Sequence, residues 1–263
     1  MQNSLQSHEK IEKQRQHFES LSDDYFSATQ HPNCLLFNQL IWKEFLARHP
    51  YILPHGAQVL EPMCGHGVAK EYLENYLHSD FNYAGFDYSQ KLVDIAQARM
   101  PEARVFLQDV TTFEVTERYD LIFLSGGLHH VYDHTQEVLE RLRRALVPGG
   151  YMLSMEPVYD NPLYGLIGRA IYKYSDKFED ESEQRYALKD LNKHYHAAGF
   201  KIMEQMYPGL AAYMIAISAF CFPRVFRESP AIIRRLVAAE NFLYRNSVGK
   251  KLSFCAATLL RNE

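Results

Sequence analysis

The sequence predicts an α/β fold: a Rossmann-like, mostly parallel sheet of about seven strands with an antiparallel last strand, helices on both faces and helical lid insertions. Three observations support it. From Ala57 onward, apolar runs of strand length alternate with amphipathic helical patterns. One such run ends in the acid-and-glycine turn Glu61 to Gly67. The next run ends in a second carboxylate, Asp87.

Size and charge limit the classes of function. A chain of 263 residues with 47% hydrophobic content can bury the core of one decorated domain. A net charge of -4 argues against a surface that binds nucleic acid throughout. The sign is uneven, because Pro223 to Glu263 holds eight Lys and Arg against three Glu.

Cysteine usage and hydropathy predict a cytoplasmic protein. The cysteines Cys34, Cys64, Cys221 and Cys255 form no C-x-x-C pair, which disfavours a zinc site or a disulfide framework. The polar N-terminus does not resemble a signal peptide. The longest apolar stretch, Leu210 to Phe222, has 13 residues and is too short to cross a bilayer, which takes about 20.

Residues 1–50 are predicted to form a tail and lid helices, and residues 51–263 the main domain. Glu9 to His49 has the pattern of two helices broken near Pro32. The second helix should pack through Leu36, Leu40, Trp42 and Phe45.

In the main domain, strands should alternate with helices. The predicted strands are Gln58 to Met63, Tyr83 to Asp87, Arg104 to Gln108, Leu121 to Ser125, Tyr151 to Met155, Lys201 to Met206 and Ser253 to Leu260. Between them, Ser89 should cap a helix that reaches Arg99. Asp133 and Gln136 resemble a capping box for a later helix, which Pro148-Gly149-Gly150 should end. A further helix is expected from Leu188 to Ala198.

Two insertions, at about 158–186 and 209–249, interrupt the alternation. Both are rich in aromatic residues, which favours an apolar or aromatic substrate held by side chains such as Tyr159 and Tyr164. Helices that only extend the core would have the same composition, so both interpretations stay open.

The glycine turn disfavours a dinucleotide site. Such a site needs a third glycine and no acid beside the pyrophosphate. Here Gly65-His66-Gly67 is followed by Val68-Ala69-Lys70, and Glu61 lies four residues upstream. Two carboxylates suit hydroxyls and a cation, and they repel phosphates. A nicotinamide-dependent oxidoreductase is therefore the weaker reading.

From Val59 to Phe200 the sequence resembles the class I S-adenosylmethionine-dependent methyltransferases, because several of their motifs occur in order. The resemblance implies that Glu61 holds the methionine amino group and that Gly65 and Gly67 form the turn. Met63 occupies the family's first glycine position, so a positive φ is not expected there and the backbone should approach the cofactor through Gly65. His66 should donate a hydrogen bond near the methionine carboxylate or face solvent.

The same resemblance places the adenosine. Asp87 should accept both ribose hydroxyls, and Tyr88 should stack on adenine or else lie on the surface. Gln108, Asp109 and Val110 match the segment where an aspartate accepts from the adenine amino group and the next backbone N–H meets the ring. A solvated loop aspartate is the alternative for Asp109.

Ser125-Gly126-Gly127-Leu128-His129-His130-Val131 follows the fourth strand, where the family places the sulfonium and the nucleophile. Ser125 is expected at the cofactor, and one of His129 and His130, preferably His129, as a base. Metal binding by these histidines with His134 is disfavoured, because no acidic or cysteine partner stands at ligand spacing.

In the family, N-terminal helices like those expected within Glu9 to His49 close over the cofactor. Tyr25 and Phe26 are therefore candidate substrate contacts, and ordinary packing against the sheet edge is the alternative.

The leading hypothesis is methyl transfer from S-adenosylmethionine, giving S-adenosylhomocysteine, to a metabolite, natural product or lipid-like acceptor. No Asn/Asp-Pro-Pro-Tyr follows the fourth strand, which weakens a nucleic-acid amino-methyltransferase. A non-methylating cyclisation or rearrangement is the alternative. Peripheral membrane contact, suggested by Leu210 to Phe222 beside Arg224, Arg227, Arg234 and Arg235, is less favoured than buried lid helices with snorkelling arginines. The acceptor atom and the oligomeric state are not encoded in any recognisable motif.

Overall fold

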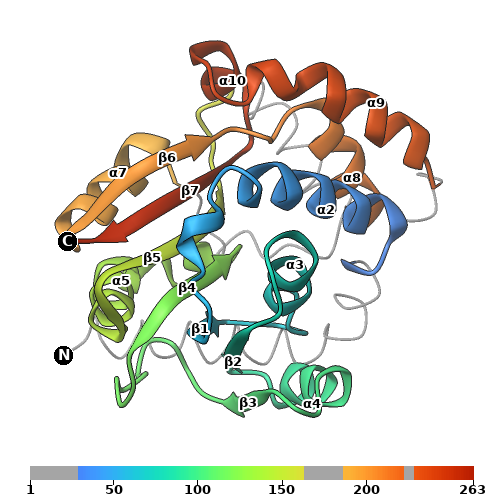
Figure 1. The fold of residues 1–263 in the computed structure, drawn as a ribbon. Coiled ribbons are helices and arrows are strands. Elements are labelled where there is room, and N and C mark those ends of the chain that lie inside the picture. Colours follow the sequence, from blue (N-terminus) through green and yellow to red (C-terminus); the bar gives the residue numbers. More distant parts are fainter. Residues whose placement is uncertain (1–28, 163–185, 222–227) are drawn as a thin grey trace.

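The computed structural model describes residues 29–162, 186–221 and 228–263, and Figure 1 shows their arrangement. Seven strands form one sheet in the order β3-β2-β1-β4-β5-β7-β6. Their bounds are β1 Ala57–Pro62, β2 Phe81–Asp87, β3 Arg104–Leu107, β4 Tyr119–Ser125, β5 Leu146–Pro157, β6 Phe200–Met206 and β7 Cys255–Asn262. β7 runs antiparallel to both neighbours, β5 and β6, while the pairs from β3 across to β5 are parallel. The predicted sheet is confirmed.

The order of the strands creates a switch point. The chain moves outward from β1 to β2 and β3, and then returns to place β4 on the other side of β1. In open parallel sheets, ligands bind at the carboxyl ends of the strands at such a point. The turn after β1 and the loop after β4 therefore meet at one edge of the sheet.

Helices cover both faces because the strands are buried on both sides. Val59 of β1 joins one hydrophobic cluster and the next residue, Leu60, joins the other. The first cluster includes side chains of α2 Pro32–Leu46, α3 Ala69–Tyr76 and α4 Gln90–Arg99; the second includes those of η2 Leu128–His134, α5 Thr135–Ala145 and α7 Leu188–Ala197.

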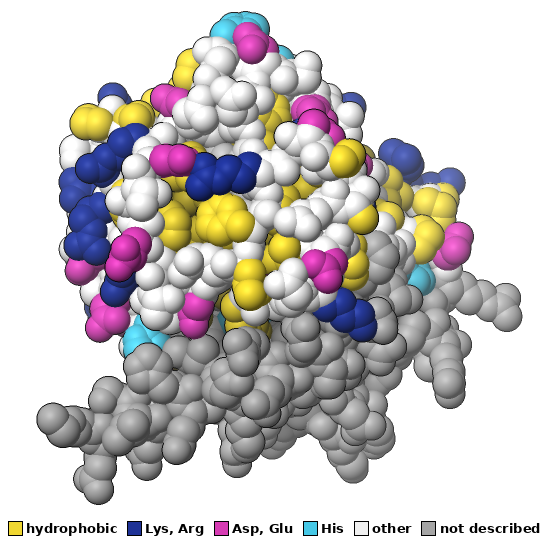
Figure 2. Space-filling model, turned by 90° about the horizontal axis from the view of Figure 1, so that it is seen from below, with side chains coloured by type: hydrophobic (Ala, Val, Ile, Leu, Met, Phe, Trp, Pro, Cys, Tyr) yellow, Lys and Arg dark blue, Asp and Glu magenta, His cyan; other side chains and the backbone are white. Residues whose placement is uncertain are grey.

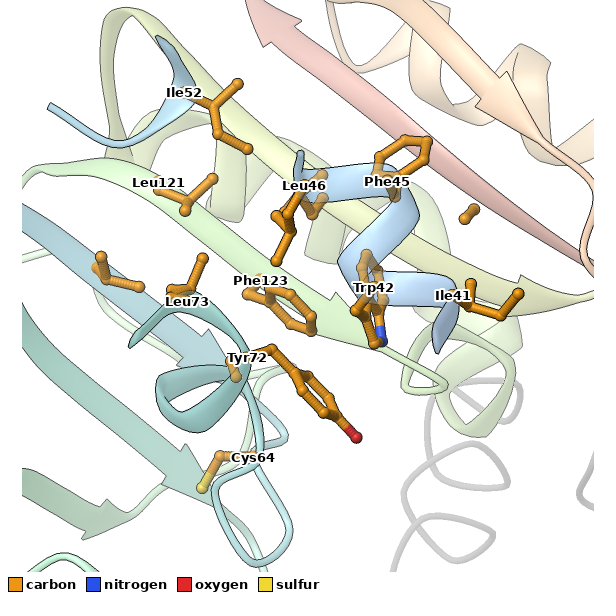
Figure 3. Close-up of a cluster of buried hydrophobic side chains, with 14 of the residues drawn as sticks. Ile41, Trp42, Phe45, Leu46, Ile52, Cys64, Tyr72, Leu73, Leu121 and Phe123 are labelled. Carbon is orange, nitrogen blue, oxygen red and sulfur yellow. The ribbon is translucent and has the colours of Figure 1, made fainter. Parts of the chain in front are cut away.

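The helix α2 lies on the sheet through aromatic side chains (Figure 3). Trp42 of α2 is 1% exposed, and its ring centroid lies 4.4 Å from that of Phe123 on β4. Leu36 and Phe45 are also buried, as their spacing predicts. The division of the chain at residue 50 stays a prediction.

The helix α8 Ala211–Cys221 takes up most of the apolar stretch, and its residues Ala212 and Ala216 are buried. It contacts α2 and α9 Pro230–Glu240, and η3 Asn241–Leu243 and α10 Ser247–Leu252 follow (Figure 1). Tyr213 meets Phe37 of α2 edge to face at 5.7 Å. No helix in the described segments is long and apolar enough to cross a membrane.

Ser89 caps α4 as expected, by accepting from the Leu92 N–H. The predicted start and end of the next helix are wrong, and so is the start of β5, which begins at Leu146 and not at Tyr151. The capping box is absent, because His134 is the N-cap of α5 and makes no side-chain cap bond. Gln136 instead meets His194 of α7 at 3.1 Å and donates to Glu140 at 2.9 Å. α5 ends at Ala145, before Pro148, because Leu146 is extended and pairs with Tyr119 of β4.

Candidate cofactor and acceptor site

A pocket opens where β1, β2 and β3 end and the loop after β4 begins. Its lining residues come from these four places in the chain and, apart from Val131, are all predicted site residues: Met63, Tyr88, Gln108, Asp109, Val110, His130 and Val131. Residues separated by more than 60 positions thus meet at the switch point of the sheet.

The loop after β3 presents an unused acceptor and an unused donor at this pocket. The backbone N–H and the hydroxyl of Thr111 both donate to Oδ1 of Asp109, each at 2.7 Å, and so fix the carboxylate. Within the described residues, Oδ2 of Asp109 accepts no hydrogen bond and the N–H of Val110 donates none. An adenine ring offers the complementary amino group and ring nitrogen.

Met63 corrects one prediction. Its φ is 53°, the only positive value at a non-glycine residue in the described segments, although a positive φ was not expected there. The turn after β1 needs a left-handed residue at this point, and a side chain adopts it at a cost of about 1–2 kcal/mol. A Cβ on Gly127 would lie 2.9 Å from the Met63 sulfur, so the side chain packs against the loop after β4.

The two turn glycines have different roles. Gly65 has a φ of +52°, and a Cβ there would have no neighbour within 4 Å, so the turn is open at this residue. The close approach of a ligand to its backbone stays a prediction. Gly67 has a φ of +75°, and a Cβ there would lie 2.1 Å from Cε of Met100, the residue that follows α4. Gly67 therefore serves packing of the turn against α4.

The Asp87 carboxylate stabilises the glycine turn by accepting backbone hydrogen bonds. Its Oδ2 accepts from the Gly65 N–H at 2.9 Å, and its Oδ1 accepts from the Ser89 N–H at 3.0 Å. The carboxylate is buried beside the pocket and does not line it. Each carboxylate oxygen can accept a second hydrogen bond, so the ribose contact stays a prediction.

Glu61 is a buried acid at the end of β1. It accepts from the Tyr83 hydroxyl at 2.5 Å and from the Ala69 N–H at 3.1 Å, at the start of α3. Burial is the largest influence and raises its pKa from 4.5 to about 8, against the hydrogen bonds that lower it. A cation bound beside Glu61 would restore the charged form.

His66 does not face solvent. It is buried, and its Nε2 lies 3.1 Å from Nε2 of Gln30, so the turn contacts the residues that precede α2. Burial lowers the pKa of His66 to about 4, which keeps the ring neutral. The expected contact with the methionine carboxylate stays a prediction.

The loop after β4 is organised by Glu156, a residue that the sequence analysis did not single out. This carboxylate at the end of β5 is fully buried and accepts from the backbone N–H groups of Gly127 and Leu128 at 3.0 and 2.9 Å. Its other oxygen lies 3.0 Å from Nδ1 of His129. Burial raises its pKa to about 7. An acid at the carboxyl end of a parallel strand, as at Glu61 and Asp87, was the available signal.

This contact selects a tautomer. A carboxylate at Nδ1 keeps the proton there, so the lone pair of the His129 ring lies on Nε2, the atom through which this ring would act as a base. The His130 ring lies 4.0 Å from that of His129, centroid to centroid, and lines the pocket. Burial is the main cause that lowers the pKa of His130, so that ring is neutral.

The remaining predicted residues are not gathered at the pocket. Ser125 ends β4 outside the lining, and Tyr159 is 45% exposed beside Tyr186. Tyr25, Phe26 and Tyr164 lie outside the described residues. No three His, Cys, Asp or Glu side chains among the described residues are grouped as a metal site would require.

Residues 59–150 match the sequence family described as a methyltransferase domain, and they contain the turn, the pocket and the loop after β4. This part of the chain is therefore similar to methyltransferase domains.

Relatives of the methyltransferase domain act on different acceptors. The chain is 36% identical over 116 residues to a trans-aconitate 2-methyltransferase of Variovorax paradoxus, covering 44% of this chain and 43% of that protein. It is 32% identical over 98 residues to a phthiotriol/phenolphthiotriol dimycocerosates methyltransferase of Mycobacterium tuberculosis, covering 36% of each. The chain thus aligns with less than half the length of these relatives.

The fold extends beyond the matched region. The cyclopropane synthase MmaA2 of Mycobacterium tuberculosis superposes with a TM-score of 0.58 over 84% of this chain and 83% of its own, at 17% identity. At that identity the similarity concerns the fold alone.

S-adenosylmethionine is the cofactor of the methyltransferase domain, and the described residues fit it. The free oxygen of Asp109 and the N–H of Val110 suit adenine, the open backbone at Gly65 leaves room beside the turn, and Glu61 suits a cationic amino group.

Proposed function

We propose that this chain transfers the methyl group of S-adenosylmethionine to a hydroxyl or an acidic carbon of a small-molecule acceptor, with His129 as the base and Glu156 as its positioning residue. The observation that carries the proposal is the buried Glu156 carboxylate 3.0 Å from Nδ1 of His129, on the loop beside the cofactor pocket. The roles of Glu61, Asp87, Tyr88 and Gln108 toward the cofactor belong to the same proposal.

The chain's residues supply alignment and proton removal. The bound cofactor supplies a methyl group on a positively charged sulfur, which is already a good leaving group. With cofactor and acceptor bound, His129 would take the acceptor proton at Nε2, and the acceptor's electron pair would form the new bond to the methyl carbon while the thioether leaves with the electrons of the carbon–sulfur bond. Glu156 stabilises the imidazolium that results. Holding the two centres in line can supply several kcal/mol of the barrier.

The names of two relatives indicate which classes of acceptor to consider. One is named for a small carboxylic acid and another for a hydroxyl-bearing lipid. A carboxylate acceptor is already ionised and needs no base, whereas a hydroxyl or an acidic carbon does. The pair of His129 and Glu156 therefore favours the latter acceptors, of metabolite or lipid-like character.

A transfer assay with isotopically labelled S-adenosylmethionine tests the proposal. The acceptors are trans-aconitate, long-chain alcohols, phenols and β-dicarbonyl compounds. Label should appear in a hydroxyl or carbon acceptor, and His129→Ala should lower kcat by about 10²- to 10⁴-fold while the dissociation constant for S-adenosylmethionine stays within about twofold. Glu156→Gln should lower kcat less and shift its pH profile.

His55→Ala is the matched control. His55 is an exposed histidine paired with Asp80, and it precedes β1, at the opposite end of that strand from the pocket. Transfer to trans-aconitate that is unaffected by His129→Ala would contradict the role of the base. Product formation without label in any acceptor would favour cyclisation or rearrangement.

A further inference from the structure

The outer surface of α9, η3 and α10 carries exposed apolar side chains. Phe242 in η3 is 75% exposed, Ile232 in α9 and Val248 in α10 are each 50% exposed, and Leu252 is exposed one helical turn after Val248. Apolar side chains that stay exposed in a group mark a contact site more often than isolated ones do.

These residues share one side of the segment. In α9 the inward positions are Ile233 and Glu240, whose carboxylate accepts from the Ala212 N–H at the start of α8. Ile232 and Arg235, three positions apart, are exposed, and the same helical spacing leads through the exposed Ala239 to Phe242.

The helix α10 continues this surface, because it is packed directly against η3. A Cβ on Gly249 would lie 1.9 Å from the Leu243 oxygen, so only glycine permits the approach. Asn246 caps α10 through the N–H groups of Val248 and Gly249, and its amide donates to the Phe242 oxygen at 3.0 Å. Val248, Lys251 and Leu252 occur at i, i+3 and i+4 on α10.

The charge on this surface is of one sign. Between Ser229 and Ser253 there are five Lys and Arg, and the only carboxylate is Glu240, which is buried. In the described part of the chain, no carboxylate forms an ion pair with Arg235 or Lys251, whereas Arg245 is paired with Glu204 and Glu44. The side of the protein seen from below Figure 1 instead shows acidic and basic side chains close together (Figure 2).

We propose that Ile232, Arg235, Phe242, Val248, Lys251 and Leu252 form a docking surface for an anionic lipid bilayer. Apolar side chains would enter the boundary between head groups and acyl chains while the basic side chains meet lipid phosphates. Charge complementarity favours this occupant, since a chain of net charge -4 concentrates unpaired positive charge here. The helix α8 contacts α2 and α9 and is not part of this surface.

Sedimentation of the full chain with vesicles tests the surface. The vesicles are pure phosphatidylcholine, or phosphatidylcholine with 30–40% phosphatidylglycerol, on the order of the anionic fraction that attracts basic surfaces. Binding should need the anionic lipid and weaken with salt. Arg235→Gln with Lys251→Gln should lower the affinity by about 25-fold, at about fivefold for each basic side chain. Phe242→Ser should lower it by about tenfold or more.

Matched variants keep the test specific. Lys189→Gln with Lys193→Gln removes the same charge from α7, and Leu107→Ser removes an apolar side chain that is 51% exposed on β3, at the other edge of the sheet. Both should bind vesicles within about twofold of the wild type. The proposal would be overturned if the control variants lost as much affinity for vesicles, or if the protein bound only neutral vesicles. It would also be overturned if the protein formed a stable dimer that Phe242→Ser disrupts and did not bind vesicles. None of these outcomes depends on methyl transfer.

Discussion

Glu61 is a buried carboxylate whose charge depends on what lies beside it. In the folded protein its pKa is raised by burial from 4.5 to about 8, and Tyr83 and the start of α3 supply its hydrogen bonds. An acid held in its neutral form near pH 7 is costly to ionise and gains most from a bound cation. Proton release from Glu61 should therefore accompany binding of the cofactor's amino group.

We expect Glu61→Gln to remove a pH dependence of stability. The folded state keeps a proton that the unfolded state releases between pH 4.5 and 8, so the free energy of unfolding falls as pH rises through this window. Between pH 6 and 8 the free energy of unfolding of the wild type should fall by about 2 kcal/mol more than that of the variant. Urea unfolding at both pH values measures this difference.

The same variant should bind S-adenosylmethionine about 10- to 100-fold more weakly at pH 8, since it lacks the charge for the ammonium group. Glu156 also has a raised pKa and contributes with the same sign, so only the difference between the two proteins is informative. Parallel pH curves for wild type and Glu61→Gln would show that Glu61 is ionised in the folded state throughout.

At the scale of single elements, α2 is attached to the sheet by aromatic packing. Figure 3 shows Trp42 and Leu46 of α2 directed toward Phe123 of β4. The ring of Trp42 lies 4.4 Å from Phe123 and 6.4 Å from Tyr72, centroid to centroid. This contact fixes the helix that follows Gln30, the partner of His66 in the glycine turn.

Trp42→Ala should lower the free energy of unfolding by about 3–5 kcal/mol, because it removes a large buried side chain and leaves a cavity between α2 and β4. Denaturant titration measures the loss. Trp42→Phe keeps most of the apolar contact and should cost clearly less. A loss below about 1 kcal/mol for Trp42→Ala would mean that α2 is not held by this contact.

At the scale of the whole molecule, the pocket joins the ends of three strands and the loop after a fourth. A ligand that bridges these elements stabilises the folded state by mass action. We expect the second oxygen of Asp109 to favour an adenine amino group, and the buried Asp87 carboxylate to oppose a pyrophosphate.

S-adenosylmethionine at 100 times its dissociation constant should stabilise the protein by about 2.7 kcal/mol, which raises the melting temperature by about 5–10 °C for a chain of this size. NAD at the same concentration should cause no comparable rise. Asp109→Ala should shift the required S-adenosylmethionine concentration upward by about tenfold or more. Equal stabilisation of wild type and Asp109→Ala would show that Asp109 does not contact adenine.

Much of the fold was predictable because its signals are local. Each strand was recognised from an apolar run, and Ser89 was recognised as a cap from its position before α4. The start of α5 could not be predicted in this way. Gln136 contacts His194, which is 58 positions away, and local sequence spacing does not reveal a contact over that distance. The role of Glu156 in β5 could not be predicted either, because its partner His129 lies on the loop after β4.

The sequence by itself determined the parallel sheet, the acid-and-glycine turn and the order of the cofactor motifs, because each depends on residues that are close neighbours in the chain. Only the tertiary structure decided that Met63 takes a positive φ, that Glu61 is buried against Tyr83, and that Glu156 reaches His129. These features arise where separate strands end together, and packing between distant segments there outweighs the preference of any single residue.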